Sequence, residues 1–330
     1  MTSRGNTWAL ILAAGEGSRL RSLTTTRSGV AIPKQFCSLN GGASLLQEAL
    51  QRAATVISPE RICAVVAAQH RRFWEVPLFH LPDANVIVQP ENRGTAHGIL
   101  LPLLRIAARD PDATVVLLPA DHHLEDEVTF AQSLRGATAL ARANPDSVYL
   151  LGIEPDSPDT ELGYILPEQG DSMHASSVSR FIEKPTHAQA QSLLDQGALW
   201  NVFVIAATAR ALLGMFERRI PGTVAQFRDA LAIDFDTQGM AVDDLYQLLP
   251  ALDFSRYIME GQEALLKVLP VPPCGWSDLG TPQRLEATLR RLPEINIRRP
   301  RLDSTVAQLS LAAQHASLAF ATLLAEGVRS

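Results

Sequence analysis

The chain has 330 residues, of which 46% are hydrophobic, and a formal net charge of −6 at pH 7. The negative charge argues against broad nucleic-acid binding, which needs a basic surface, and no apolar run of the sequence is long enough to span a membrane. The three cysteines lack metal-binding spacing and are too few for a disulfide framework, so we expect a cytoplasmic protein with reduced cysteines.

The first apolar run ends in a glycine-rich loop. Residues 7–13 predict a strand that is buried on both faces, because their apolar character is continuous rather than alternating. Gly15 and Gly17 follow, and glycine can take backbone angles that let amide N–H groups close around an anion. Arg19 adds a fixed positive charge. The loop therefore predicts a phosphate site at the carboxyl end of a strand, where open α/β sheets bind ligands.

Two commoner glycine motifs do not fit the spacing. A dinucleotide fingerprint requires glycine or alanine three residues after Gly17, where Leu20 stands. It also requires an acidic residue near the end of the second strand, where Ala68 and Gln69 stand. A P-loop ends in Gly-Lys-Ser/Thr, and the nearest lysine here is Lys34. The spacing therefore disfavours a dinucleotide oxidoreductase and a P-loop enzyme.

Strands and helices alternate along the first half of the chain. Apolar runs bounded by turn residues predict strands, and apolar residues at helical spacing predict helices. We expect strands at 62–67, 85–88, 114–118 and 148–153, with a helix capped by Ser44 and helices at 95–108 and 127–143. This alternation predicts an α/β fold with a doubly wound, mostly parallel sheet.

The second half is less regular, because prolines and glycines interrupt it. We expect strands at 179–185, 202–206 and 267–271 and helices at 187–197, 208–219, 223–232, 241–249 and from Pro282.

Lysine is rare in this chain. Among 29 basic residues the lysines are Lys34, Lys184 and Lys267. An ammonium group is a compact point charge, whereas a guanidinium group is a wide planar fork. A position that keeps lysine in an arginine-rich chain is therefore a candidate for a site too narrow for arginine. We expect such sites at Lys34 and Lys184. For Lys267, a functional role and a plain surface position are both open.

Two aspartates are candidate metal ligands. Asp121 follows the expected strand at 114–118, and Asp278 lies in a loop rich in glycine, tryptophan and serine. Magnesium is typically held by one or two carboxylates together with substrate phosphates, so Mg²⁺ is the expected cofactor. Each aspartate alone is also typical of a turn or a helix cap. His122 and His123 form no zinc-ligand pattern, and the sequence contains no evident catalytic nucleophile.

Several motifs in a fixed order resemble one enzyme family. Residues 12–20, followed by residues 33–36, resemble the signature of sugar-1-phosphate nucleotidyltransferases. Further segments are similar to the mannose-1-phosphate guanylyltransferase branch, namely residues 89–96, 118–122, 181–185, 200–201 and 276–280. The resemblance covers residues 7–292 and implies the Rossmann-like fold of these enzymes.

The resemblance also implies a role for each motif. It places the nucleotide against Leu12, Ala13, Gly15, Gly17, Arg19, Asn92, Gly94 and Thr95. It places the sugar phosphate against Gly163, Glu183, Lys184 and Asn201. It assigns catalysis to Arg19, Lys34, Asp121 and Asp278, with both aspartates as Mg²⁺ ligands. The implied partners are a nucleoside triphosphate, GTP, and a sugar-1-phosphate, mannose-1-phosphate, which give GDP-mannose and pyrophosphate. Such chemistry needs positioning and charge neutralisation more than acid–base groups.

Departures from the family pattern leave the substrate open. The segment between Leu20 and Pro33 is longer than usual, Val202 follows Asn201 where a small residue is usual, and the loop around Gly163 has one glycine where two are frequent. The alternatives are a nucleotidyltransferase of other specificity, such as a glucose-1-phosphate thymidylyltransferase, and a non-catalytic, ligand-sensing relative.

The resemblance predicts one catalytic domain at residues 1–292 in a short form without the isomerase domain of long guanylyltransferases. We expect a basic, proline-flanked linker at 293–301 and a helix at 302–330. The apolar stripe of that helix must be buried, either on its own domain or against a second copy in a homodimer.

Overall fold

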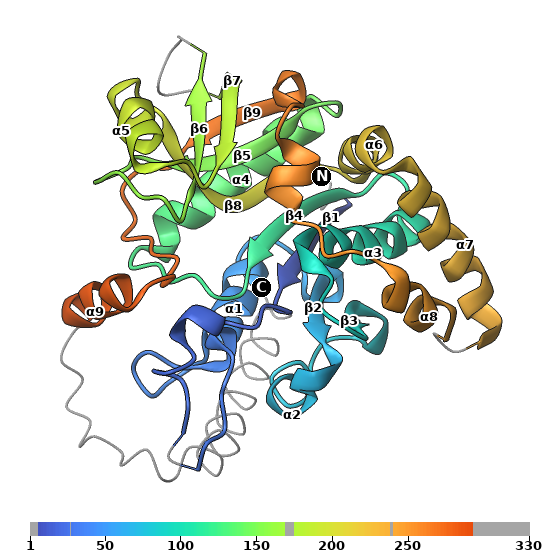
Figure 1. Cartoon of the computed structure of the whole chain (residues 1–330). Coiled ribbons are helices and arrows are strands. Elements are labelled where there is room, and N and C mark those ends of the chain that lie inside the picture. The colour runs from blue at the N-terminus through green and yellow to red at the C-terminus, as the bar shows by residue number, and fades with distance from the viewer. Residues whose placement is uncertain (1–5, 27, 169–174, 238–239, 293–330) are drawn as a thin grey trace, which may run out of the picture.

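The computed structural model describes residues 6–26, 28–168, 175–237 and 240–292. Within them, nine strands form a single sheet: β1 (Thr7–Leu12), β2 (Ile62–Ala67), β3 (Val86–Gln89), β4 (Thr114–Pro119), β5 (Val148–Ile153), β6 (Gly163–Pro167), β7 (Ser176–Glu183), β8 (Leu199–Thr208) and β9 (Leu266–Pro270). Their order across the sheet is β3-β2-β1-β4-β8-β5-β9-β7-β6, and β6 pairs with β8 as well (Figure 1). The sheet therefore curls back on itself at its β6 end.

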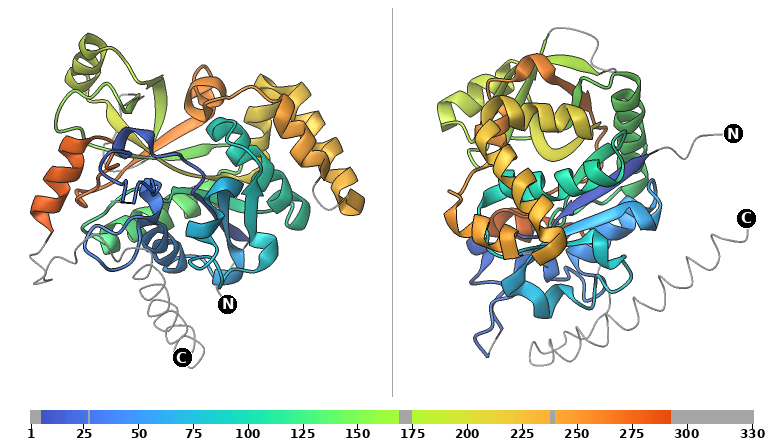
Figure 2. Two further views of the ribbon diagram at one scale, coloured as in Figure 1. Left: turned by 60° about the horizontal axis from the view of Figure 1, so that its bottom comes forward. Right: turned by 90° about the vertical axis from the view of Figure 1, so that its right-hand side faces the viewer.

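The helices of the described residues cover the sheet and its edges. They are α1 (Leu45–Ala54), α2 (Arg71–Trp74), α3 (Gly94–Arg109), α4 (Glu127–Ala143), α5 (His187–Asp195), α6 (Ala209–Arg219), α7 (Pro221–Thr237), α8 (Met240–Leu248) and α9 (Pro282–Arg291). In Figure 2 (right), the yellow and orange helices α6–α8 and the green helix α4 lie on opposite sides of the molecule.

Alternation along the strands divides the core into two layers. Trp8 and Leu10 of β1 pack in one buried cluster with residues of α3 and α6–α8. Ala9 and Ile11, the alternate residues of β1, pack in a second cluster with α1 and α4. Because successive side chains of a strand point to opposite faces, one apolar strand fills both layers. The predicted α/β, doubly wound fold is therefore confirmed.

Local signals explain the element bounds that were predicted correctly. β2, β5 and α4 have the predicted bounds. α1 begins where predicted because Ser44 caps it: its hydroxyl accepts from the Gln47 N–H, and the Gln47 side chain accepts from the Ser44 N–H. This reciprocal capping satisfies two donors that an isolated helix end leaves unpaired.

The sheet is more mixed than the predicted, mostly parallel arrangement. Strands β1–β4 pair in parallel, as do β5 and β9. However, β8 runs antiparallel to β4, β5 and β6. The prediction came from strand–helix repeats in the first half, whereas β6 and β7 form an antiparallel pair that needs no helical crossover. β8 also begins at Leu199, three residues before the predicted strand at 202–206.

The described part of the chain ends just after α9. In Figure 1, α9 lies at the opposite end of the molecule from α7 and α8, and Figure 2 (left) agrees. The predicted linker at 293–301 and the predicted helix at 302–330 lie outside the described residues. None of the described helices has the length and apolar content needed to cross a membrane.

Candidate active site

A cavity of about 670 Å³ opens at the carboxyl ends of the parallel strands. Strand register places Leu12 beside both Val65 and Pro119, and Ala67 beside Gln89. Leu12, Val65, Gln89 and Pro119 all line the cavity. The loops that leave these strands therefore meet in one place, as expected for a ligand site of an open α/β sheet.

The glycine loop is held against the segment that carries Lys34. Gly17 has a φ of 61°, and a Cβ atom at this position would lie 2.9 Å from the backbone nitrogen of Lys34. The Gln35 side chain donates hydrogen bonds to the carbonyls of Ala13 (2.9 Å) and Gly15 (2.8 Å). Gly15 lines the cavity, whereas the predicted nucleotide-binding residues Ala13 and Gly17 are not among the residues that line it. Only glycine fits both the angle and the space at Gly17.

Lys34 connects the two predicted metal ligands. It is 8% exposed, and its Nζ lies 2.8 Å from Asp121 Oδ2 and donates to the backbone carbonyl of Asp278. Burial alone raises the pKa of Asp121, but the charge of Lys34, joined by that of His122 once this ring is protonated in acid, outweighs it and holds that pKa below its usual value. Asp121 is therefore a carboxylate at neutral pH, and Lys34 occupies a narrow site as predicted from its rarity.

Asp278 is buried, and its carboxylate contacts α9. Its Oδ1 accepts from the Gly280 N–H (3.1 Å) and lies 3.1 Å from Arg284 Nε. Asp121 and Asp278 both line the cavity. Among the described residues, no group of three or more His, Cys, Asp or Glu side chains is placed to hold a metal ion. Two carboxylates at a cavity with room for phosphates fit the donor set of Mg²⁺, which takes its other ligands from phosphates and water.

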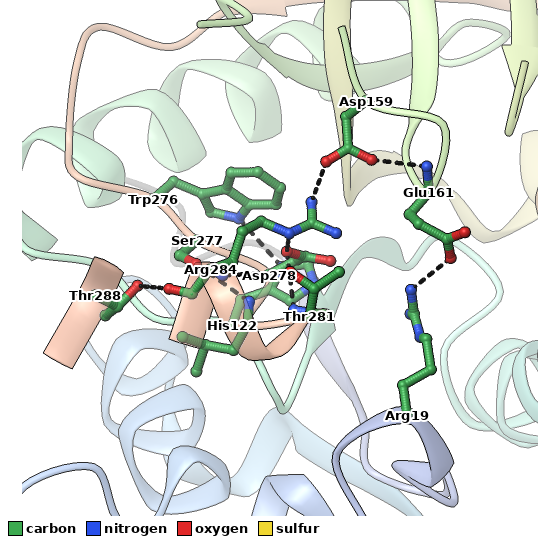
Figure 3. Close-up of polar contacts among 12 residues, drawn as sticks. Arg19, His122, Asp159, Glu161, Trp276, Ser277, Asp278, Thr281, Arg284 and Thr288 are labelled. Carbon is green, nitrogen blue, oxygen red and sulfur yellow. Dashed lines mark hydrogen bonds and ion pairs between the residues drawn. The ribbon is translucent and has the colours of Figure 1, made fainter. Parts of the chain in front are cut away.

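His122 lies beside these carboxylates as a neutral ring. Trp276 Nε1 donates to His122 Nδ1 at 3.2 Å (Figure 3), and the two rings meet edge to face. Burial lowers the pKa of His122 to about 4, since the opposing attraction of Asp121 is smaller. Indole nitrogen only donates, so Nδ1 of His122 is an acceptor and Nε2 carries the ring proton. The sequence analysis gave His122 no role.

The segment after β3 lines the far end of the cavity. Asn92, Gly94 and Thr95 all face it. Asn92 Oδ1 accepts from the Gly94 N–H (3.0 Å), and Thr95 Oγ1 accepts from the Phe254 N–H (2.8 Å). Gln89, which is 1% exposed, has no hydrogen-bond partner for its Oε1 among the described residues. A buried acceptor of this kind is costly unless a ligand or water pairs with it.

One cross-strand row contains three of the predicted sugar-binding residues. Gly163 of β6 pairs with Glu183 of β7 on one side and with Asn201 of β8 on the other. A Cβ atom at Gly163 would lie 2.6 Å from Glu183 Oε2 and 3.3 Å from Asn201 Cβ. All three residues line the cavity. Asn201 can pair with Gly163 because β8 begins at Leu199. The strand predicted at 202–206 began after Asn201.

Glu183 is a carboxyl group that titrates near neutral pH. Burial raises its pKa to about 7, and the negative charge of Asp253 adds to this, while Lys184 and Ser255 oppose it. Lys184 lies at the cavity with its Nζ 3.8 Å from Glu183 Oε1, but its side chain is 43% exposed. The narrow-site argument therefore holds for Lys34 and not for Lys184.

Strained backbone is concentrated at this cavity. Among the described residues, the non-glycine residues with positive φ are Lys184 (50°), Phe203 (55°) and Leu279 (49°). Lys184 and Phe203 line the cavity, and Leu279 follows Asp278 directly. Positive φ costs free energy for non-glycine residues and is retained where the surroundings or a function demand it.

An acidic loop reaches across the cavity mouth. Glu161, between β5 and β6, pairs with Arg19 of the glycine loop at 2.8 Å. Asp159 of the same loop pairs with Arg284 at 3.0 Å. Figure 3 shows the line of contacts from Arg284 through Asp159 and Glu161 to Arg19. Arg19 therefore faces the cavity with its charge already paired to a carboxylate.

Comparison with known proteins places the chain in a family. Residues 8–294 match the family described as "Nucleotidyl transferase". The chain belongs to this family. The family that its motifs resemble is thereby confirmed.

Curated relatives of this nucleotidyl transferase family member include longer proteins. The chain is 30% identical over 306 residues to the mannose-1-phosphate guanylyltransferase ManC of Salmonella typhimurium, covering 88% of this chain and 61% of that protein. It is 30% identical over 289 residues to the mannose-1-phosphate guanylyltransferase of Escherichia coli K12, covering 83% of this chain and 58% of that protein. The chain therefore spans less than two thirds of the length of both relatives.

Solved structures agree with the fold. A Thermus thermophilus protein, described as a mannose-1-phosphate geranyltransferase, matches with a TM-score of 0.74 at 26% identity, covering 88% of this chain and 81% of that one. A UDP-glucose pyrophosphorylase complexed with UDP-glucose matches with a TM-score of 0.58 at 14% identity, covering 87% of this chain and 98% of that one. The second likeness concerns the fold alone.

Several groups at the cavity of this nucleotidyl transferase family member were not predicted from the sequence. Gln89 and His122 lie inside motifs that were recognised, so their positions were available but not their environment. Glu161 and Arg284 carried no local signal, because their contacts with Arg19 and Asp159 join segments that are distant in the sequence.

Proposed function

We propose that this nucleotidyl transferase family member catalyses transfer of a nucleoside monophosphate from GTP to mannose-1-phosphate, giving GDP-mannose and pyrophosphate, with Mg²⁺ as cofactor. The observation that carries the proposal is one cavity that joins a glycine loop, two carboxylates and the row Glu183–Gly163–Asn201. The glycine loop suits phosphates, and the row offers hydroxyl-binding groups for a sugar.

The residues divide the work of an in-line displacement. An ionised oxygen of the sugar phosphate attacks the α-phosphorus, and the bond to the bridging oxygen breaks as pyrophosphate leaves. The attacking oxygen carries no proton, so no general base is needed, and burial, which lowers the pKa of His122 to about 4, makes that ring a weak base. Lys34 neutralises charge that develops on the phosphates, and Arg19 holds the departing pyrophosphate.

Asp121 and Asp278 are the residues that would hold Mg²⁺. When bound, the ion would neutralise phosphate charge and fix the orientation of the triphosphate. The chain's own contribution is to hold both side chains at the cavity wall, where Lys34 pairs with the Asp121 carboxylate and donates to the backbone carbonyl of Asp278.

The three cysteines are unsuited to a covalent route. Burial raises the pKa of Cys37 and Cys274 to about 11 and that of Cys63 to about 12. These groups are thiols rather than nucleophilic thiolates at neutral pH. A direct displacement without an enzyme-bound intermediate fits this finding.

A second candidate is a nucleotidyltransferase with another base or sugar, such as a glucose-1-phosphate thymidylyltransferase. Gln89 is compatible with this candidate, because its neutral amide both donates and accepts hydrogen bonds. Such a group pairs with the O6/N1–H edge of guanine and equally with the imide edge of thymine. Base choice therefore does not follow from Gln89 alone.

A screen of pyrophosphate release tests the proposal. The common nucleoside triphosphates are each combined with mannose-1-phosphate, glucose-1-phosphate and related sugar phosphates in the presence of Mg²⁺. GTP with mannose-1-phosphate is expected to give the highest kcat/KM. A higher value for another pair would establish the second candidate. No release with any pair would leave the ligand-sensing relative, which thermal stabilisation by nucleotide would then identify.

A further inference from the structure

Arg284 connects three segments of the chain around Asp278. Its Nε lies 3.1 Å from Asp278 Oδ1, and its Nη1 lies 3.0 Å from Asp159 Oδ2 (Figure 3). The side chains of Arg284, Asp278 and Asp159 are 20%, 10% and 22% exposed. Both contacts are ion pairs, because Nε, Nη1 and Nη2 of Arg284 have no hydrogen-bond partner among the described residues. The two carboxylates lie beside different nitrogens of one planar cation.

Both ends of this bridge are anchored. Thr281 Oγ1 accepts from the Arg284 N–H (3.2 Å), and Thr288 Oγ1 donates to the Arg284 carbonyl (2.9 Å). At the far end, the Asp159 N–H donates to the hydroxyl of the buried Tyr164 at 2.8 Å. The arginine therefore reaches Asp278 from a fixed helix start, and its second contact is on an equally fixed loop.

Lys34 is a second cation that contacts Asp278, although not through its carboxylate. The Lys34 ammonium donates to the backbone carbonyl of Asp278 itself and pairs with Asp121. A freely rotating Asp278 carboxylate would thus have a second cation within reach. Pairing of the two would occupy both the lysine that faces the phosphates and a carboxylate of the cavity wall.

We propose that Arg284 is a positioning residue, which holds the Asp278 carboxylate at the cavity wall and away from Lys34, with Asp159 as its fixed second anchor. Asp278 lines the cavity, whereas Arg284 is not among the described residues that line it, so Arg284 acts through Asp278. This inference rests on the proposed function, because it treats Asp278 as a ligand of Mg²⁺.

Kinetics of three variants test the bridge. Arg284→Ala is expected to lower kcat about thirtyfold while the KM for the nucleoside triphosphate changes by less than about twofold. Arg284→Lys restores only part of kcat, because one ammonium group does not reproduce two fork contacts. Asp159→Asn lowers kcat about fivefold in the wild-type background and has no further effect in Arg284→Ala, since the two residues act through one contact.

A binding measurement adds a readout without turnover. Mn²⁺ is titrated into protein without sugar phosphate, both with and without GTP and against a protein-free blank, and free Mn²⁺ is followed by electron paramagnetic resonance. Arg284→Ala is expected to weaken Mn²⁺ binding about fivefold. Arg290→Ala, which loses an exposed ion pair with Glu286 on the same helix, is the control. It should keep wild-type kcat and Mn²⁺ affinity, whatever its melting temperature.

The outcomes separate this inference from the proposed function. Wild-type activity together with unchanged kcat and Mn²⁺ affinity in Arg284→Ala would overturn the role of Arg284 and leave the function standing. Additive losses in the double variant would overturn the bridge through Asp159. A wild-type protein without activity for any substrate pair would overturn the function, and the Mn²⁺ titration would still decide whether Arg284 positions Asp278.

Discussion

The two ends of the cavity are built on different principles. At the phosphate end, Lys34, Asp121 and Asp278 come from segments far apart in the sequence, and ion pairs join Lys34 to Asp121 and Arg284 to Asp278. At the sugar end, Gly163 lies between Glu183 and Asn201 in adjacent antiparallel strands, so backbone register sets their spacing. Changes of charge should therefore damage the first end, and changes of side-chain size should damage the second.

The largest effect is expected from removing a carboxylate at the phosphate end. Asp121→Asn and Asp278→Asn should each lower kcat by about a hundredfold to a thousandfold, the range for loss of a preorganised electrostatic contact. The amide is isosteric, so the fold should be kept, although the melting temperature should fall because Lys34 or Arg284 loses a charge partner. Steady-state kinetics at limiting Mg²⁺ check this, and full activity in either variant would show that the residue is not a metal ligand.

The next largest effect is expected from replacing the ammonium group of Lys34 by a wider group of the same charge. Lys34→Arg should lower kcat about a hundredfold, because the buried site between Asp121 and the Asp278 carbonyl leaves no room for a guanidinium fork. Lys267→Arg is the matched control, since Lys267 contacts Ser177 in the β7–β9 pair rather than the cavity. Equal kinetics for the two variants would contradict the narrow-site argument.

The same contrast explains how far sequence reasoning reached. β2, β5 and α4 were predicted with their bounds because apolar runs and caps are local signals. The direction of β8 and its start at Leu199 were not predicted, because both depend on pairing with strands elsewhere in the chain. Motifs brought the right residues together at the cavity, but the contacts among them, such as Arg284 with Asp278, follow only from the folded arrangement.

At the sugar end, added size should act on binding. Gly163→Ala places a Cβ atom 2.6 Å from Glu183 Oε2, so Glu183 must move. We expect the KM for the sugar-1-phosphate to rise about tenfold, with a much smaller change in the KM for the nucleoside triphosphate. Gly136→Ala in α4 is the control, because its Cβ atom would make an ordinary contact of 3.6 Å with Leu269. An equal rise in both KM values would mean that the two ends are not independent.

Protonation of Glu183 should give the sugar end a pH dependence. With a pKa raised to about 7 by burial and Asp253, its carboxylate is lost as pH falls through 7. If the carboxylate accepts sugar hydroxyls, KM for the sugar-1-phosphate should rise about tenfold from pH 8 to pH 6. Glu183→Gln should remove this component of the profile, and an unchanged profile in that variant would assign the titration to another group.

The same shift has a consequence for stability. The folded protein holds the Glu183 proton up to about pH 7, whereas an unfolded glutamate releases it near pH 4.3. Between these values the folded state binds more protons, so stability falls as pH rises. The melting temperature of the wild-type protein should therefore fall from pH 5 to pH 7.5, relative to the melting temperature of Glu183→Gln over the same range.

The smallest effect is expected where the two ends meet at the cavity mouth. Glu161, next to the sugar end, pairs with Arg19 of the phosphate end, and their side chains are 46% and 51% exposed. A triphosphate must compete with Glu161 for Arg19, but an exposed pair is worth at most about 1 kcal/mol, or about fivefold in binding. Glu161→Gln should thus lower the KM for the nucleoside triphosphate two- to fivefold at low salt, and the gain should disappear at high salt.

Glu217→Gln, which breaks a similarly exposed pair with Arg228 between α6 and α7, is the control and should leave KM unchanged. If Glu161→Gln instead raised this KM, Glu161 would be holding Arg19 in place for the phosphates rather than competing with them.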